Sequence, residues 1–201
     1  GVFQATRGTV RIHFPFTEHA TILVGEVALT DQSGCRRVLQ PGDSYLVRQG
    51  SDVLWEVNGA RVQKSFFNRT EPADAPGPLV LYPRGSAVPD AALADLGPPA
   101  ALGAEVLDGD PHIAGRIDLA TPVISGGVLQ TTRGEMRVNF AFTGHAAVTR
   151  GGLVLTGGDG AAHALAPGDS YLVREGAAVG WDVDGSRTQQ SFLHLVPGAS
   201  P

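Results

Sequence analysis

Short runs that alternate apolar and polar residues dominate this chain, and glycine-rich turns separate them at regular intervals. Val10 and Ile12, for example, flank Arg11, a period of two that is typical of a β-strand with one buried face. No stretch carries the 3.6-residue period of an amphipathic helix over enough residues to compete with the strands. The pattern predicts an all-β chain with one short helix, around Asp90–Leu96.

Turn signals recur at matched places along the chain. The triplet Pro-Gly-Asp occupies residues 41–43 and again 167–169. The dipeptides Asn58-Gly59 and Asp184-Gly185 are those that a tight hairpin with positive φ prefers, and alternating residues flank both. We therefore predict a β-hairpin at each dipeptide.

The turns recur because the chain contains an internal duplication. Residues 1–68 return without a gap as residues 127–194, at a constant offset of 126 and with about half of the paired positions identical. We predict a first repeat at 1–72, a Pro- and Ala-rich linker at 73–108 and a second repeat at 109–201. Residues 117–125 look like a strand that leads into the second copy, whereas the first copy starts at Gly1 without such a strand.

Each copy resembles the cupin family. The resemblance is carried by GVFQATRGTVRIHFPFTEHATILVGEVALTD, PGDSYLVRQG and VLWEV in the first copy, and by GVLQTTRGEMRVNFAFTGHAAV, PGDSYLVREG and VGWDV in the second. Each copy is similar in particular to the branch of the family that contains ureidoglycine aminohydrolase and the ethanolamine-utilisation cupins. The resemblance implies two tandem jelly-roll β-barrels, a bicupin, but this fold hosts many unrelated functions.

The resemblance also implies a place for a divalent metal. A cupin typically holds one with a His-x-His pair, a later Glu and a late His; in the first copy only His13 and Glu18 match this set. The second copy has Asn139 and Gly144 at those two positions, so no metal is expected there. We expect at most one divalent ion, Mn, Fe, Ni or Zn, held by His13, Glu18 and groups from elsewhere.

Arginine occupies the first position of the pair in both copies. If the polar face of these strands lines the barrel, as it does in cupins, Arg11 and Arg137 each reach a cavity and bind a carboxylate or phosphate there. If that face meets solvent, they are ordinary surface charges. The polar residues that we place beside them as candidate ligand-binding groups are Gln63, Asn139 and Gln189.

Charge and composition narrow the choice of partners. The net charge is −5 and Lys64 is the only lysine, so nucleic acid is not an expected partner. No apolar run approaches the roughly 20 residues that span a membrane, and no signal peptide opens the chain. With Cys35 as the single cysteine, we expect a cytoplasmic protein.

Three functions remain open. The first is a bicupin that binds a small polar metabolite, in particular an anionic one, in its barrel cavity. Catalysis is not part of this hypothesis. The second is a metal-dependent enzyme of aminohydrolase, isomerase or oxygenase type that acts through the first copy. The third is a structural cupin whose sheets build a homo-oligomer. Because His13 and Glu18 survive only in the first copy, we expect that copy to be the functional one.

Overall fold

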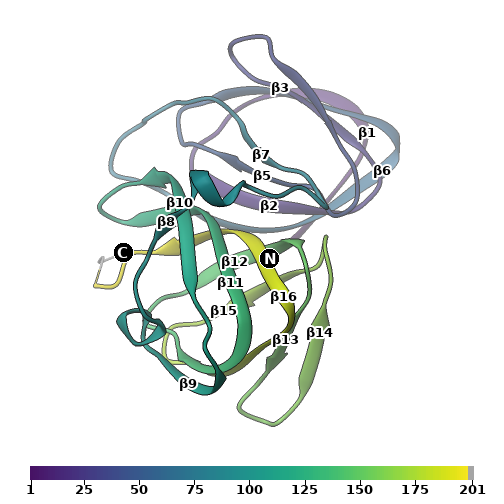
Figure 1. Ribbon diagram of the computed structural model, residues 1–201. Coiled ribbons are helices and arrows are strands. Elements are labelled where there is room, and N and C mark those ends of the chain that lie inside the picture. Colours follow the sequence, from purple (N-terminus) through teal and green to yellow (C-terminus); the bar gives the residue numbers. More distant parts are fainter. Residues whose placement is uncertain (199–201) are drawn as a thin grey trace. The chain divides into compact units, whose positions relative to one another are not determined.

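The computed structural model describes residues 1–198 and confirms the all-β prediction. The chain forms two compact units, Gly1–Pro83 and a second unit that begins at Arg84. Each unit is a sheet that curls on itself, drawn in purple to blue for the first unit and in green to yellow for most of the second (Figure 1).

The first unit is a seven-stranded sheet with the order β4-β3-β6-β2-β5-β7, in which β1 also pairs with β6. Its strands are β1 (Val2–His13), β2 (Thr17–Val24), β3 (Val27–Thr30), β4 (Arg36–Leu39), β5 (Ser44–Val47), β6 (Asp52–Arg69) and β7 (Val80–Tyr82).

The second unit repeats this arrangement as a nine-stranded sheet with the order β14-β13-β16-β11-β10-β8, to which β12, β15 and β9 are added. Its strands are β8 (Ala94–Asp95), β9 (Ala104–Gly109), β10 (Ile113–Ala120), β11 (Ile124–Asn139), β12 (Gly144–Arg150), β13 (Leu153–Thr156), β14 (Ala162–Leu165), β15 (Ser170–Val173) and β16 (Ala178–Leu195). Two short 3₁₀ helices, η1 (Asp90–Ala92) and η2 (Pro99–Leu102), lie before β9. The helix expected around Asp90–Leu96 is thus present only as the single turn of η1.

The prediction of a β-hairpin at Asn58-Gly59 is wrong, and so is the prediction at Asp184-Gly185, because each dipeptide lies inside one continuous strand. Residues 52–69 form one continuous strand, β6, and both of its halves pair antiparallel with β1. The register shifts between Thr6 and Gly8, which face Arg61 and Val57, so the dipeptide lies in a bulge. Gly59 is not among the glycines with positive φ. Long-range pairing with β1 therefore overrides the local turn preference.

The bulge allows each long strand to serve two neighbours on its other edge. The first half of β6 pairs with β3 and the second half with β2. At the turn after β2 the chain approaches β6 closely: Gly25 has a φ of 78°, and a Cβ there would lie 2.1 Å from the carbonyl oxygen of Arg61. Gly151 has the same φ and the same crowding in the second unit. Only glycine fits this position.

The apolar face of the alternating strands points into each barrel. In the first unit Phe14, Ile22, Trp55 and Val62 belong to one buried cluster. In the second unit the corresponding residues of the cluster include Phe140, Val148 and Trp181. Burial of these side chains fixes the strand register, since a one-residue slip would turn every apolar side chain outward.

The two units differ along the outer edge of their first long strand. In the second unit β10 and β9 pair with β11 on the edge that β16 leaves free. Among the described residues, β1 pairs only with β6. The strand expected at residues 117–125 is found as β10 and the start of β11, and the first unit has no equivalent of it within residues 1–83.

Residues of the expected linker, 73–108, take part in both sheets. β7 pairs with β5 of the first unit, and Leu46 lies opposite Val80. β8 and β9 pair with β10 and β11 of the second unit. The division between the compact units falls between Pro83 and Arg84, inside that segment. Within residues 1–198, no helix is both long and apolar enough to cross a bilayer.

A pair of glutamines faces across the long strands in both units, but only the second pair is buried. Gln189 is 1% exposed, and its Nε2 donates to Gln130 Oε1 at 2.7 Å and to the carbonyl oxygen of Val88 at 2.8 Å. The backbone N–H of Val88 donates to Gln189 Oε1 at 2.8 Å. This network fastens the segment before η1 to the sheet. In the first unit, Gln63 donates to Gln4 at 2.7 Å on an exposed face.

We predict that Gln189→Ala destabilises the second unit by about 1–3 kcal/mol, because it leaves the backbone N–H and C=O of Val88 without their side-chain partner and removes one of the donors to Gln130. Gln63→Ala, the matched change in the first unit, should cost less than about 0.5 kcal/mol because its pair is exposed. Urea unfolding measures both values, and hydrogen exchange should show lost protection at the Val88 amide in the first variant only. Equal costs for the two variants would contradict the assignment.

Candidate functional site

The first barrel encloses a cavity of about 260 Å³. Its wall consists mainly of apolar and aromatic side chains from β1 and β6 and the segment that follows β1. The lining residues are Phe3, Ala5, Val10, Ile12, Phe14, Phe16, Glu18, Trp55, Lys64, Phe66 and Asn68. Two charged side chains, Glu18 and Lys64, therefore lie in an otherwise apolar wall.

Glu18, Tyr45 and Lys64 form one hydrogen-bonded cluster from three neighbouring strands, β2, β5 and β6. Lys64 Nζ donates to Glu18 Oε1 in a short ion pair and to Tyr45 Oη at 2.8 Å. The Tyr45 hydroxyl donates to the same Glu18 oxygen at 2.8 Å. Lys64 is 6% exposed and Glu18 2%. Each buried polar group thus has partners, which a buried charge requires.

Aromatic rings surround the lysine nitrogen. The ring centroids of Phe3, Tyr45, Trp55 and Phe66 lie 5.0–5.6 Å from Nζ. Burial lowers the pKa of Lys64 from its ordinary value, and the Glu18 carboxylate opposes this shift. Burial, together with the charge of Glu18, raises the pKa of Tyr45 well above its ordinary value. The tyrosine is therefore a hydrogen-bond donor at neutral pH.

The second barrel keeps the tyrosine and loses both charges. Gly144 and Gln190 occupy the positions that correspond to Glu18 and Lys64. The Tyr171 hydroxyl donates to Gln190 Oε1 at 2.6 Å. A neutral amide has replaced an ion pair, and the barrel still forms.

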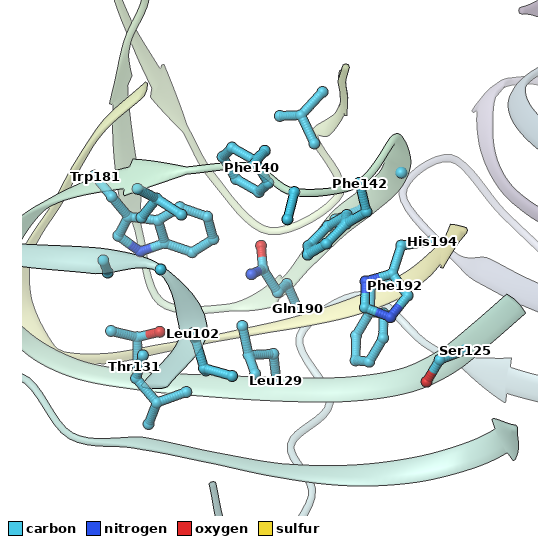
Figure 2. A pocket seen from close by; sticks show the side chains of 18 of the residues that line it. Leu102, Ser125, Leu129, Thr131, Phe140, Phe142, Trp181, Gln190, Phe192 and His194 are labelled. Carbon is cyan, nitrogen blue, oxygen red and sulfur yellow. The ribbon is translucent and has the colours of Figure 1, made fainter. Parts of the chain in front are cut away.

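A larger cavity, of about 520 Å³, lies in the second barrel. Figure 2 shows Gln190 among aromatic and aliphatic side chains, with Phe140, Phe142 and Trp181 beside it. The rings of Phe140 and Phe142 meet edge-on at a centroid distance of 5.4 Å. No Asp, Glu, Lys or Arg of the described chain lines this cavity. Its volume lies within the range of small-molecule sites, about 300–1,000 Å³.

The polar groups in this wall are few and uncharged at neutral pH. Burial lowers the pKa of both His145 and His194 to about 4. The ring of His194 packs at 4.1 Å from that of Phe142. Burial also raises the pKa of Tyr171. The amide of Gln190 also lies in this wall, as do Ser125, Thr131 and Asn139. The Nε2 atom of Gln190 has no acceptor among the described residues.

The structure does not bring His13 and Glu18 together. His13 lies on the outside of the barrel with 61% of its side chain exposed, where Nδ1 is 3.2 Å from Asp52 Oδ1. Its Nε2 is 3.7 Å from an oxygen of Asp74. Glu18 is inside, held by Lys64 and Tyr45. These residues do not fit a divalent metal, and residues 1–198 contain no group of three or more His, Cys, Asp or Glu that does.

The polar face that carries Arg11 points to solvent, which is the second of the two alternatives that the sequence left open. Val10 and Ile12, not Arg11, line the first cavity. In the second unit Arg137 is also exposed, with Nη1 3.4 Å from an oxygen of Glu105 on β9. Burial of the apolar face leaves the alternating arginines no other side.

The remaining candidates divide between surface, core and cavity. Gln63 pairs with Gln4 on the surface, and Gln189 belongs to the buried network with Val88, so neither lines a cavity. Asn139 is exposed and lines part of the larger cavity. Of the predicted ligand-binding residues, it alone lines either of the two cavities described above.

Sequence reasoning missed the role of Lys64, although a signal was present. Lys64 is the only lysine, and the duplication replaces it with Gln190 at the same time as Gly144 replaces Glu18. A paired loss of opposite charges is what a contact between the two side chains produces. Tyr45 gave no such signal because both copies keep it.

Comparison with known proteins agrees with the fold. The model of the EutQ-like cupin domain matches residues 1–66 and 120–191. A search of the curated proteins found no match.

Solved structures show the same fold at low identity. A protein of unknown function from Pseudomonas syringae pv. tomato is 18% identical, with a TM-score of 0.77 over 96% of this chain and 80% of that chain. A cupin 2 conserved barrel domain protein from Leptotrichia buccalis is 11% identical, with a TM-score of 0.55 over 97% and 82%. A putative glyoxylate induced protein from Pseudomonas aeruginosa is 12% identical, with a TM-score of 0.55 over 94% and 70%. At such identities the likeness shows the fold alone.

Buried His145 and half-buried His194 predict acid sensitivity of the second unit. Their pKa of about 4 in the folded state lies below the ordinary value of about 6.5. Between these values the unfolded chain binds more protons, so stability falls as pH drops from about 6.5 to about 4. We predict that His194→Phe, which keeps the ring contacts, makes the fall in Tm over this pH range smaller by about 4 °C or more.

Thermal melting at a series of pH values measures the effect. His163→Gln is the control, because His163 is exposed on β14, and it should melt with the same pH dependence as the unchanged protein. An unchanged pH dependence in His194→Phe would show that His194 protonation does not limit acid stability.

Proposed function

Because the chain belongs to the EutQ-like cupin family and builds two tandem cupin barrels, we propose that it is a small-molecule-binding bicupin whose second barrel holds the ligand. The ligand is a small, mainly apolar and uncharged organic molecule. The observation that carries this proposal is the cavity of about 520 Å³, lined by apolar and aromatic side chains and by no charged one.

The chemistry of the wall selects against an anion. A carboxylate or phosphate would need a cation or several N–H groups to replace its hydration. Arg11 and Arg137, the groups expected to supply them, lie outside the cavities. Neutral His145 and His194 add no positive charge at neutral pH. The expectation of an anionic metabolite therefore gives way to an uncharged one.

Gln190 and Tyr171 give the cavity a point of polar recognition deep among its aromatic side chains. The Tyr171 hydroxyl donates its hydrogen bond to Gln190 Oε1. This bond orients the amide, so that Nε2 remains available to donate to a ligand. A ligand with one hydroxyl or carbonyl group on an apolar body satisfies that donor. One such hydrogen bond contributes about 1 kcal/mol, a factor of about five in affinity.

Binding is favoured over metal-dependent catalysis. The resemblance to ureidoglycine aminohydrolase suggested hydrolysis at a metal, but His13 and Glu18 are engaged by other partners on opposite sides of the barrel wall. The second barrel has Asn139 and Gly144 at the matching positions. We therefore assign no hydrolytic step to either barrel.

We predict that 4-ethylphenol and ethylbenzene both bind the second barrel, the phenol about fivefold more tightly. In the double variant Tyr171→Phe with Gln190→Leu, ethylbenzene should bind as before while the preference for the phenol disappears. Ligand-observed NMR titration measures both affinities.

A cavity-filling variant locates the binding. Ala146→Phe places a ring in the cavity and should abolish binding of both probes, whereas Ala178→Phe, on an exposed position of β16, should leave it intact. Undiminished binding to Ala146→Phe, or no binding of either probe to the unchanged protein, refutes the proposal.

A further inference from the structure

The first barrel contains a group that the proposed function does not use, a buried primary amine at the wall of its own cavity. Lys64 lines the cavity of about 260 Å³ and is 6% exposed. Phe3 and Val10 in the same wall are 46% and 52% exposed, so the cavity reaches solvent beside β1. A small molecule that enters there meets the Nζ atom.

The ion pair is not needed to build the barrel. The second copy has the same strand order around its cavity with Gly144 and Gln190 in place of Glu18 and Lys64. Burying an ion pair costs desolvation energy that an amide or an apolar residue avoids. The first copy therefore carries a costly pair in a fold that forms without it, which points to a chemical role.

We propose that Lys64 is a carbonyl-reactive amine and that the first cavity takes small uncharged aldehydes or ketones, which condense with Nζ to an imine. Lysine amines become nucleophilic when a desolvating environment favours the neutral form. The rings of Phe3, Trp55 and Phe66 supply that environment at 5.0–5.6 Å from Nζ. This inference is independent of the ligand proposed for the second barrel.

Glu18 and Tyr45 are placed to move the protons of this reaction. The Lys64 ammonium passes one proton to the Glu18 carboxylate, its hydrogen-bond partner, and the freed lone pair attacks the carbonyl carbon. The carbonyl oxygen takes the Glu18 proton as the carbinolamine forms, with the Tyr45 hydroxyl, hydrogen-bonded to both side chains, assisting its protonation.

Loss of water then completes the condensation. The carbinolamine oxygen takes the second proton of the nitrogen and leaves as water, while the carbon–nitrogen double bond forms. One ammonium, one carboxylate and one carbonyl compound thus give one iminium, the same carboxylate and one water. The iminium keeps the positive charge beside Glu18, so the charge of the buried pair is unchanged.

The experiment is reductive trapping with sodium cyanoborohydride at pH 7, with propanal and benzaldehyde as probes, followed by mass spectrometry of the intact chain and its peptides. Lys64 is the only lysine. Peptide mapping therefore has to distinguish an adduct on Lys64 only from an adduct on the terminal amine. We expect at least one probe to modify Lys64, and Lys64→Gln, which copies the residue of the second barrel, to remove that adduct.

The matched control is Arg7→Lys in the Lys64→Gln background, which moves the single lysine to an exposed position of β1. We expect trapping at Lys64 to be at least tenfold faster than at this exposed lysine, and Tyr45→Phe and Glu18→Gln to slow it. Circular dichroism verifies that each variant is folded. If both probes label Lys64 no faster than the exposed lysine, or leave it unlabelled, the proposal is overturned whether or not the Glu18 variant folds.

Discussion

The antiparallel pairing of one long bent strand with a single partner, β6 with β1 and β16 with β11, is the constraint on which both barrels depend. Its bulge lets the second half of the strand leave β3 and meet β2. The same pairing fixes which side of β1 faces inward, because Val10 and Ile12 lie opposite the buried Trp55 and Val53. The cavity wall, the outward arginines and the place of Lys64 follow from this register.

Duplication gave this chain two copies of one scaffold, and the copies differ in the charge and polarity of their cavities. In the first, Glu18 and Lys64 place a charged pair inside an aromatic wall. In the second, Gly144 and Gln190 remove the charge, and the cavity is larger and almost wholly apolar. The contrast between the cavities shows that the scaffold tolerates a change of inner polarity without a change of strand order. The expectation that only the first copy is functional rested on two residues that never meet.

The sequence predicts the fold well because alternation and duplication both report on burial. It fails at Asn58-Gly59, where a local turn preference competes with pairing along the whole of β1, a partner more than 40 residues away in the chain. It fails at Arg11 and His13 for a different reason: alternation separates two faces but does not say which one is inside. The cluster at Lys64 depends on three strands distant in sequence, and only the paired change in the second copy hints at it.

The unpaired edge of β1 has a consequence for the exposure of its apolar side chains. Val2 is 68% exposed and Val10 52%, whereas Val128 and Met136, which occupy the same places on β11 beneath β10 and β9, are 2% and 1% exposed. The exposure of the two valines is therefore a direct result of the missing strand neighbours on this edge within residues 1–198.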